Sequence, residues 1–126
     1  MIKIYLAGGF QSGWQDKVKA AFVNAEYFDP RLKEPKMNKL DEISTWDFLR
    51  IKQSDIVFAY MERINPSGFG LSVEIGYARG INKTIILVLE KNHEIHKDKH
   101  LQFLTCVADV VFDDLDSAIE FLKSFD

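Results

Sequence analysis

The sequence predicts a three-layer α/β domain, in which helices cover both faces of a five-stranded, mostly parallel sheet. Apolar runs of strand length alternate along the chain with segments whose apolar residues recur at helical spacing. One of these runs, 56–61, is apolar at nearly every position, which indicates a strand buried on both faces. The chain has 126 residues, 47% of them hydrophobic, so we treat 1–126 as one domain with one core.

The N-terminal third contains two expected strands separated by a helix. Residues 2–7 form an apolar run that stops at Gly8, the pattern of a buried strand followed by a tight turn. Helical spacing of apolar residues follows over 12–24. Residues 26–29 are consistent with a second strand, which Pro30 ends.

The middle of the chain begins with a polar, proline-containing stretch over 31–40, which we interpret as a mobile surface loop or a lid. Residues 41–53 then read as a helix, and 56–61 as the third strand. A second helix is entered from a glycine turn and covers about 70–80. The run 84–89 is the strongest strand pattern in the chain.

The C-terminal part has weaker signals. Residues 91–100 are charged and hold all three histidines, and 108–112 suggest the last strand. Residues 117–125 form an amphipathic helix that Asp114 or Asp116 could cap.

Strands that alternate with helices pair in parallel through right-handed crossovers, and we expect the strand order 2-1-3-4-5 of flavodoxin-like and Rossmann-like sheets. In such sheets a ligand lies beyond the carboxyl ends of the strands, where the strand order switches. That rule brings the segments 8–13, 61–70 and 90–96 around one crevice, together with the start of the 70–80 helix.

Composition excludes several classes of partner. The net charge is −3 and no basic stripe runs along the chain, so a nucleic-acid polymer is not expected as a partner. No apolar run is long enough for a membrane span, and the N-terminus has no signal-peptide pattern. The single cysteine, Cys106, fits a reducing cytoplasm, and we expect it to be a buried structural thiol.

Glu74 is the most informative residue. At about 100° per residue it shares a helical arc with Leu71, Ala78 and Ile81, so an acid falls where the pattern calls for an apolar residue. A buried carboxylate needs a partner or a function. The alternative is a partly exposed acid that Arg79 or a backbone amide satisfies.

The first loop contains Gly8, Gly9 and Phe10. Glycines there let the backbone approach a ligand, and the next helix offers free N–H groups, although a simple strand-to-helix turn explains them equally well. The aromatic side chain of Phe10 could lie against a nucleobase.

Two further acids lie near the third strand. Asp55 stands at its entry, where a turn acid is the plainer interpretation, and Asp47 lies three residues before Arg50, the spacing of an exposed ion pair. The three histidines lack the pattern of a zinc helix, and we expect neither a metal nor a cofactor.

Taken together these elements resemble the nucleoside 2-deoxyribosyltransferase family and its deoxynucleotide N-hydrolase relatives. The resemblance covers about residues 2–89, and its blocks follow in order. They are Ile4-Tyr5-Leu6-Ala7-Gly8, Asp47, Ser54-Asp55-Ile56-Val57-Phe58-Ala59, and Ser67-Gly68 through Glu74-Ile75-Gly76-Tyr77-Ala78.

The resemblance implies a role for each matching residue. Glu74 would be the nucleophile that attacks C1′ of deoxyribose, Tyr5 would orient it, and Asp55 would protonate the leaving base. The substrate would also be bound by a set of residues from the loops and the 41–53 helix: Gly8, Gly9, Phe10, Asp47, Ser67, Gly68 and Gly70. It further implies a homo-oligomer whose pocket is shared between subunits.

The sequence departs from the family pattern at two places. Gly68 stands where transferases carry a second aspartate, and Gln11 stands where the hydrolases carry a basic residue. Because the first loop lacks a charge that would bind a phosphate, we expect transfer of deoxyribose from a nucleoside to an acceptor base. Hydrolysis of a 2′-deoxynucleoside 5′-monophosphate, and a non-catalytic nucleotide-binding domain with a regulatory role, remain the alternatives.

Overall fold

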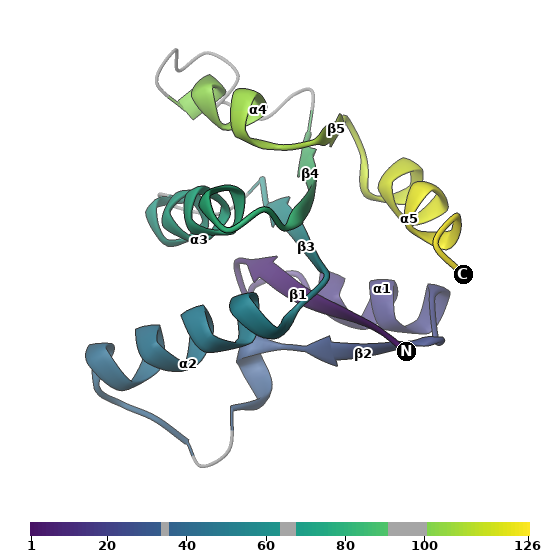
Figure 1. The fold of residues 1–126 in the computed structure, drawn as a ribbon. Coiled ribbons are helices and arrows are strands. Elements are labelled where there is room, and N and C mark those ends of the chain that lie inside the picture. The colour runs from purple at the N-terminus through teal and green to yellow at the C-terminus, as the bar shows by residue number, and fades with distance from the viewer. Residues whose placement is uncertain (34–35, 64–67, 91–100) are drawn as a thin grey trace.

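The computed structural model describes residues 1–33, 36–63, 68–90 and 101–126, and its centre is a five-stranded sheet (Figure 1). The strands are β1 (Ile2–Gly8), β2 (Ala25–Phe28), β3 (Ile56–Met61), β4 (Thr84–Leu89) and β5 (Val110–Phe112). They lie in the order β2-β1-β3-β4-β5, and each neighbouring pair is parallel. The predicted fold class and strand order are therefore confirmed.

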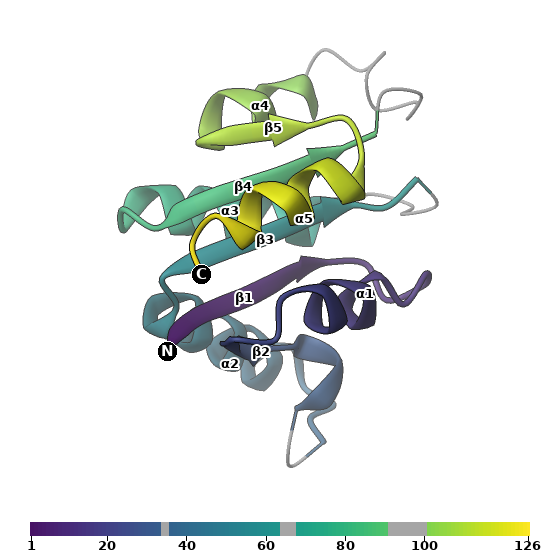
Figure 2. The same ribbon diagram turned by 90° about the vertical axis from the view of Figure 1, so that its right-hand side faces the viewer.

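Helices cover both faces of the sheet. They are α1 (Trp14–Ala21), α2 (Leu40–Gln53), α3 (Phe69–Gly80), α4 (Leu104–Val107) and α5 (Leu115–Lys123), with short 3₁₀ helices η1 (Pro30–Leu32) and η3 (Leu101–Phe103). Helices α1 and α5 pack on one face, and α2, α3 and α4 pack on the other (Figures 1 and 2).

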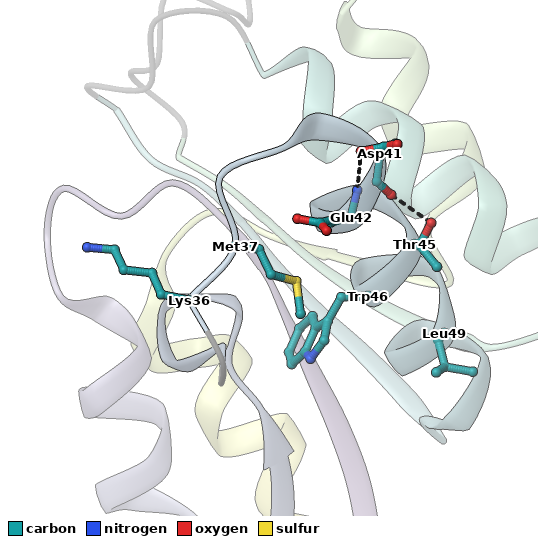
Figure 3. A pocket seen from close by; sticks show the side chains of 7 residues that line it. All are labelled: Lys36, Met37, Asp41, Glu42, Thr45, Trp46 and Leu49. Carbon is teal, nitrogen blue, oxygen red and sulfur yellow. Dashed lines mark hydrogen bonds between the residues drawn. The ribbon is translucent and has the colours of Figure 1, made fainter.

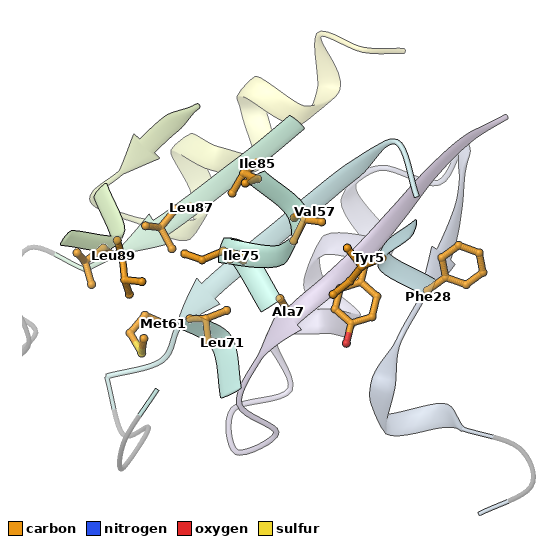
Figure 4. Packing of buried hydrophobic residues seen from close by; sticks show 14 residues of the cluster. Tyr5, Ala7, Phe28, Val57, Met61, Leu71, Ile75, Ile85, Leu87 and Leu89 are labelled. Atoms are coloured by element: carbon orange, nitrogen blue, oxygen red, sulfur yellow. The ribbon is translucent and has the colours of Figure 1, made fainter. Parts of the chain in front are cut away.

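Alternation along β1 decides which side chain meets which layer. Ile4 and Leu6 pack toward α1 and α5, whereas Tyr5 and Ala7 face α2 and α3. Each is completely buried, as expected for a strand in the middle of a parallel sheet. Tyr5 thus lies in the apolar layer beneath α3, and Figure 4 shows its side chain in this cluster, with Phe28 of the neighbouring strand beside it.

The structure refines one expectation about local structure, the loop over 31–40, and contradicts another, the buried Cys106. The first residues of the expected 31–40 loop lie in or directly after η1, which the carboxylate of Asp29 caps by accepting from the Arg31 amide. Asp29 is 4% exposed and also binds Lys19 at 2.6 Å, so this segment is fixed to α1. Cys106 is exposed on α4, because the apolar face of this short helix is supplied by Leu104.

The carboxyl end of β1 is closely packed. Gly8 has φ +150° and pairs with Tyr60 on β3, and a Cβ atom added at Gly8 would lie 2.4 Å from the Tyr60 carbonyl oxygen. Neither the backbone conformation nor the space accepts a side chain. This glycine lets the first loop leave the sheet directly above β3.

We predict that Gly8→Ala lowers the free energy of unfolding by about 2–4 kcal/mol, because the backbone of β1 and β3 must separate. Urea denaturation followed by far-ultraviolet circular dichroism measures the change. Gly70→Ala is the matched control, since nothing outside α3 lies within 4 Å of its added Cβ. The control should not lose stability, and equal denaturation midpoints for Gly8→Ala and the unmodified protein would contradict the packing argument.

Candidate active site

A hydrogen bond between the sheet and α3 forms the floor of the candidate site. The hydroxyl of Tyr5, on β1, donates to Oε2 of Glu74, on α3. Leu71, Ile75 and Ala78 of the same helix pack into the core, so the helix must present Glu74 toward the sheet. The alternative partner is excluded, because Arg79 binds Asp109 at 3.2 Å.

The environment of Glu74 favours its protonated form. The pKa of Glu74 is raised to about 7, mainly by burial and also by the charge of Asp47, against the hydrogen bond from Tyr5 and the charge of Lys33. Burial, and then the charges of Glu74 and Asp47, raise the pKa of Tyr5 far above its ordinary value. Tyr5 is therefore a neutral donor at any physiological pH, while Glu74 changes its charge near neutrality.

Asp47 and Lys33 complete a polar cluster around this hydrogen bond. Asp47 projects from α2 close enough to Tyr5 and Glu74 to raise the pKa of both. Lys33, which follows η1, binds Oδ1 of Asp47 at 3.0 Å, and both side chains are largely buried. The cluster contains two carboxyl groups, one ammonium group and one phenol.

A crevice of about 340 Å³ opens beside Glu74 at the carboxyl ends of β1 and β3. It is lined by the first loop and the start of α3: Gly8, Gly9, Phe10, Gln11, Gly68, Gly70, Leu71 and Glu74. A neighbouring cavity of about 530 Å³ lies beyond Phe10 and is lined by Lys33, Lys36, Met37 and Asp47, among others. Phe10 borders both spaces and is 55% exposed. Glu74 and Asp47 thus face adjoining spaces.

The protein itself fixes the first loop. Trp14 and Gln15 each donate to the carbonyl oxygen of Gly9 at 3.0 Å. The buried carboxylate of Glu62 accepts from the amide of Ser12 at 2.7 Å and from that of Gln11 at 3.4 Å. Amides that could have bound a phosphate therefore bind a carboxylate of the same chain.

The structure does not bring Asp55 to this crevice. Asp55 precedes β3 and so lies at the amino end of the strand, at the opposite edge of the sheet. Its exposed carboxylate accepts from the backbone amide of Lys3 at 2.8 Å, which joins β1 to the start of β3. Asp55 thus has the turn-acid role that its sequence position suggests.

The remaining sequence candidates lie where the rule for parallel sheets puts them. Gly8, Gly9, Phe10 and the two helix-start glycines, Gly68 and Gly70, line the crevice, and Asp47 lies beside it. Ser67 and the three histidines fall outside the described residues.

Lys33 and Glu62 are site residues that sequence reasoning missed. Lys33 lay in a stretch interpreted as a mobile loop. The available signal for Glu62 was a charged residue directly after a fully apolar strand.

A larger hollow of about 600 Å³ lies on the outer side of α2 and is separate from this cluster (Figure 3). It is lined by Lys36, Met37, Asp41, Glu42, Thr45, Trp46 and Leu49. Its acids lie in the first turn of the helix, where carboxylates are favoured by the helix dipole. It contains neither Tyr5 nor Glu74, so we do not assign the chemistry to it.

Within the described ranges, no group of three His, Cys, Asp or Glu side chains is arranged to hold a metal ion. The helices of those ranges include none long and apolar enough to cross a membrane.

Comparisons with known proteins agree with this geometry. A family model described as nucleoside 2-deoxyribosyltransferase like matches residues 1–92. Among solved structures, the Clostridium botulinum protein described as the CMP N-glycosidase BcmB is 19% identical, with a TM-score of 0.65. That alignment covers 98% of each chain, and at this identity it shows a common fold. No curated protein matches the sequence.

We predict that Glu74 makes stability depend on pH between about 4.5 and 7. The folded protein binds the Glu74 proton more tightly than the unfolded chain does, so this contribution is full at low pH and is lost as pH rises through the folded pKa. The unmodified protein should lose free energy of unfolding on the order of 2 kcal/mol over this pH range, and Glu74→Gln should not show this loss.

Urea denaturation of both proteins from pH 4 to 8 measures the difference, which should grow with pH in favour of Glu74→Gln. Glu26→Gln is the matched control, because Glu26 is an exposed glutamate on β2. A stability difference that is independent of pH would show that Glu74 is ionised throughout this range.

Proposed function

The chain belongs to the nucleoside 2-deoxyribosyltransferase-like family, and we propose that it cleaves the N-glycosidic bond of a 2′-deoxynucleoside through a covalent bond to Glu74. The observation that carries this proposal is the hydrogen bond from Tyr5 to a largely buried glutamate beside a crevice. Positive charge develops at C1′ as the bond to the base breaks. A carboxylate held next to that carbon stabilises the charge and then bonds to it.

Tyr5 orients the nucleophile. Its hydroxyl comes from a fully buried strand position and holds one carboxylate oxygen of Glu74, a residue that lines the crevice. The hydrogen bond also stabilises the ionised carboxylate that attack requires. Because Tyr5 stays neutral, it donates this hydrogen bond without giving up its own proton to Glu74.

Asp47 is the acid that we propose for the leaving base, in place of Asp55. Among the described acids it lies beside Glu74 and borders the cavity next to Phe10. In the forward step a Glu74 oxygen bonds to C1′, the C1′–N bond breaks, and the base takes its electron pair and a proton from Asp47. An acceptor base or water then attacks C1′, returns its proton to Asp47 and releases Glu74.

Transfer to a second base is the outcome that we favour. The first-loop amides of Gln11 and Ser12 are bound to Glu62, which leaves them unavailable to a 5′-phosphate. An unphosphorylated nucleoside fits this crevice better than a nucleotide does.

Hydrolysis of a nucleoside 5′-monophosphate is the second candidate. The BcmB protein, which shares the fold, is described as an N-glycosidase of CMP. Lys36 borders the cavity beyond Phe10 and is exposed, so it is a cation within reach of an anionic substrate group. The third candidate, a silent ligand-binding domain, predicts binding without turnover.

We predict that Glu74→Gln abolishes turnover, because an amide cannot form the glycosyl ester. Tyr5→Phe should slow the reaction on the order of 10–1000-fold, and Asp47→Asn should slow it most for bases that leave poorly. Chromatography of reactions with deoxyadenosine, deoxycytidine or their monophosphates, with and without a second base, measures these rates.

A swapped base identifies a transferase, and free base without an acceptor identifies a hydrolase. Asp55→Asn is the matched control for Asp47→Asn and should retain near-normal rates. Turnover by Glu74→Gln at the unmodified rate would remove Glu74 as nucleophile. A ligand-dependent rise in melting temperature without turnover would support the silent domain.

We also propose a homo-oligomer formed through the outer face of α3. Phe69, Val73, Gly76 and Gly80 are exposed at helical spacing, and the two glycines would let another helix approach closely. Phe69 is 73% exposed and Val73 57% exposed, an apolar surface that favours a partner. The crevice opens at the start of the same helix, so a second copy would lie near it.

We predict that Val73→Lys lowers the mass measured by sedimentation equilibrium from that of an oligomer to that of one chain, because it buries a charge in the interface. Val23→Lys is the matched control, as Val23 is 77% exposed and lies after α1. A monomeric unmodified protein at tens of micromolar would contradict this interface.

A further inference from the structure

Lys33 is held against the catalytic cluster by three contacts. Its Nζ atom lies 3.0 Å from Oδ1 of Asp47, donates to the carbonyl oxygen of Pro30 at 3.2 Å, and lies 5.0 Å from the centre of the Trp46 ring. Only 11% of the Lys33 side chain and 19% of the Asp47 side chain is exposed. A long, flexible side chain is rarely fixed so completely, and its surroundings leave the ammonium group directed at one carboxylate.

The backbone that carries Lys33 is fixed as well. Asp29 is buried, caps η1 and binds both Lys19 and Arg31. Arg31 also binds Asp16 of α1 at 2.8 Å. Arg31 lies two residues before Lys33, so the segment that carries Lys33 is attached to α1 at that point.

Two carboxyl groups compete for one cation in this cluster. Lys33 forms its ion pair with Asp47, whereas Glu74 receives a hydrogen bond from Tyr5. The described charged and titratable groups around the pair come from each packed element: Tyr5 from β1, Lys33 from the segment after η1, Asp47 and Arg50 from α2, and Glu74 and Tyr77 from α3. Arg50 lies over the rings of Phe28 and Trp46, so Lys33 is the described cation that contacts a carboxylate of the pair.

We propose that Lys33 is a positioning residue that holds Asp47 ionised and so keeps the proton shared by the two carboxyl groups on Glu74 in the ligand-free protein. The contribution of Lys33 to catalysis rests on the proposed function. In that reaction Glu74 attacks as a carboxylate and Asp47 gives a proton to the base. The resting protein has the reverse arrangement, with the proton on Glu74 and the charge on Asp47.

One proton transfer converts the resting cluster to the reactive one. The O–H bond of Glu74 breaks, an O–H bond forms on Asp47, and the negative charge moves from Asp47 to Glu74 without change in net charge. Lys33 opposes this transfer while it contacts Asp47. A substrate group that accepts a hydrogen bond from Lys33 in the cavity beyond Phe10 weakens that contact and so releases the transfer.

The test is a carboxyl titration by nuclear magnetic resonance, with ¹³C in the carboxyl groups of Glu and Asp. Spectra of Glu74→Gln and Asp47→Asn assign the two signals. In the unmodified protein the titration near neutral pH should appear on Glu74. In Lys33→Met the upper titration of the pair should rise by roughly 1–3 pH units and should be shared between Glu74 and Asp47.

Two variants separate charge from packing. Lys33→Arg keeps the cation and should keep the titration on Glu74, and Lys36→Met is the matched control from the same cavity, since Lys36 is exposed. Lys33→Gln replaces Lys33→Met if the latter does not melt cooperatively. An unchanged titration in Lys33→Met or Lys33→Gln, or an equal shift in Lys36→Met, overturns the proposal.

This experiment needs no substrate, so it separates the two proposals. Absence of turnover in the unmodified protein sinks the proposed function and leaves the titration to decide the role of Lys33. Turnover with an unchanged Lys33→Met titration sinks the role of Lys33 alone. Where turnover is observed, the alkaline limb of the kcat/KM profile should move upward with this titration in Lys33→Met, because loss of the shared proton removes the acid that the leaving base needs.

Discussion

Glu74 places a carboxyl group in the largely apolar layer between the sheet and α3, and the arrangement of the site depends on satisfying it. Part of the cost of this burial is offset by Tyr5, from the central part of β1, whose hydroxyl donates to Glu74. Tyr5 pairs in register with Val57 of β3 and Phe28 of β2, so neighbouring strands on both sides fix its backbone. The sheet therefore fixes the hydroxyl group that holds Glu74, the nucleophile that we propose.

The first loop also depends on a buried carboxylate that the protein's own donors satisfy, in this case Glu62. Glu62 leaves β3 at the same edge of the sheet and binds the amides of the loop that forms the opposite wall of the crevice. Trp14 also stacks on Phe58 and meets Tyr60 edge to face, which ties the loop to the other layer of the core. Both walls are thus set by contacts of the protein with itself, and a ligand meets a crevice whose shape costs little to form.

Much of this arrangement could be predicted from the sequence. Continuous apolar runs gave β3 and β4, and the topological rule for parallel sheets then placed the glycine loops and Glu74 at one edge. The assignment of Asp55 from the family resemblance was wrong. Asp55 lies in a well-matched block of sequence, but it precedes β3 and is therefore at the amino end of the strand, away from the crevice. Asp47, eight residues earlier on α2, lies close to Tyr5 instead.

Lys33 was missed for another reason. Proline and charge suggested a surface loop, and only tertiary contacts with Asp47 and Trp46 make its ammonium group part of the site.

In the proposed reaction, the division between transfer and hydrolysis would depend on the cavity beside Asp47 more than on Glu74. A glycosyl ester on Glu74 would react with whichever nucleophile next occupies the place that the leaving base vacates. An acceptor base would use the same contacts that we propose for the leaving base, namely the ring of Phe10 on one side and the carboxyl group of Asp47 on the other. Water needs neither contact. Residues that hold a base in this cavity, rather than residues that build the ester, therefore decide how often an acceptor arrives before water does.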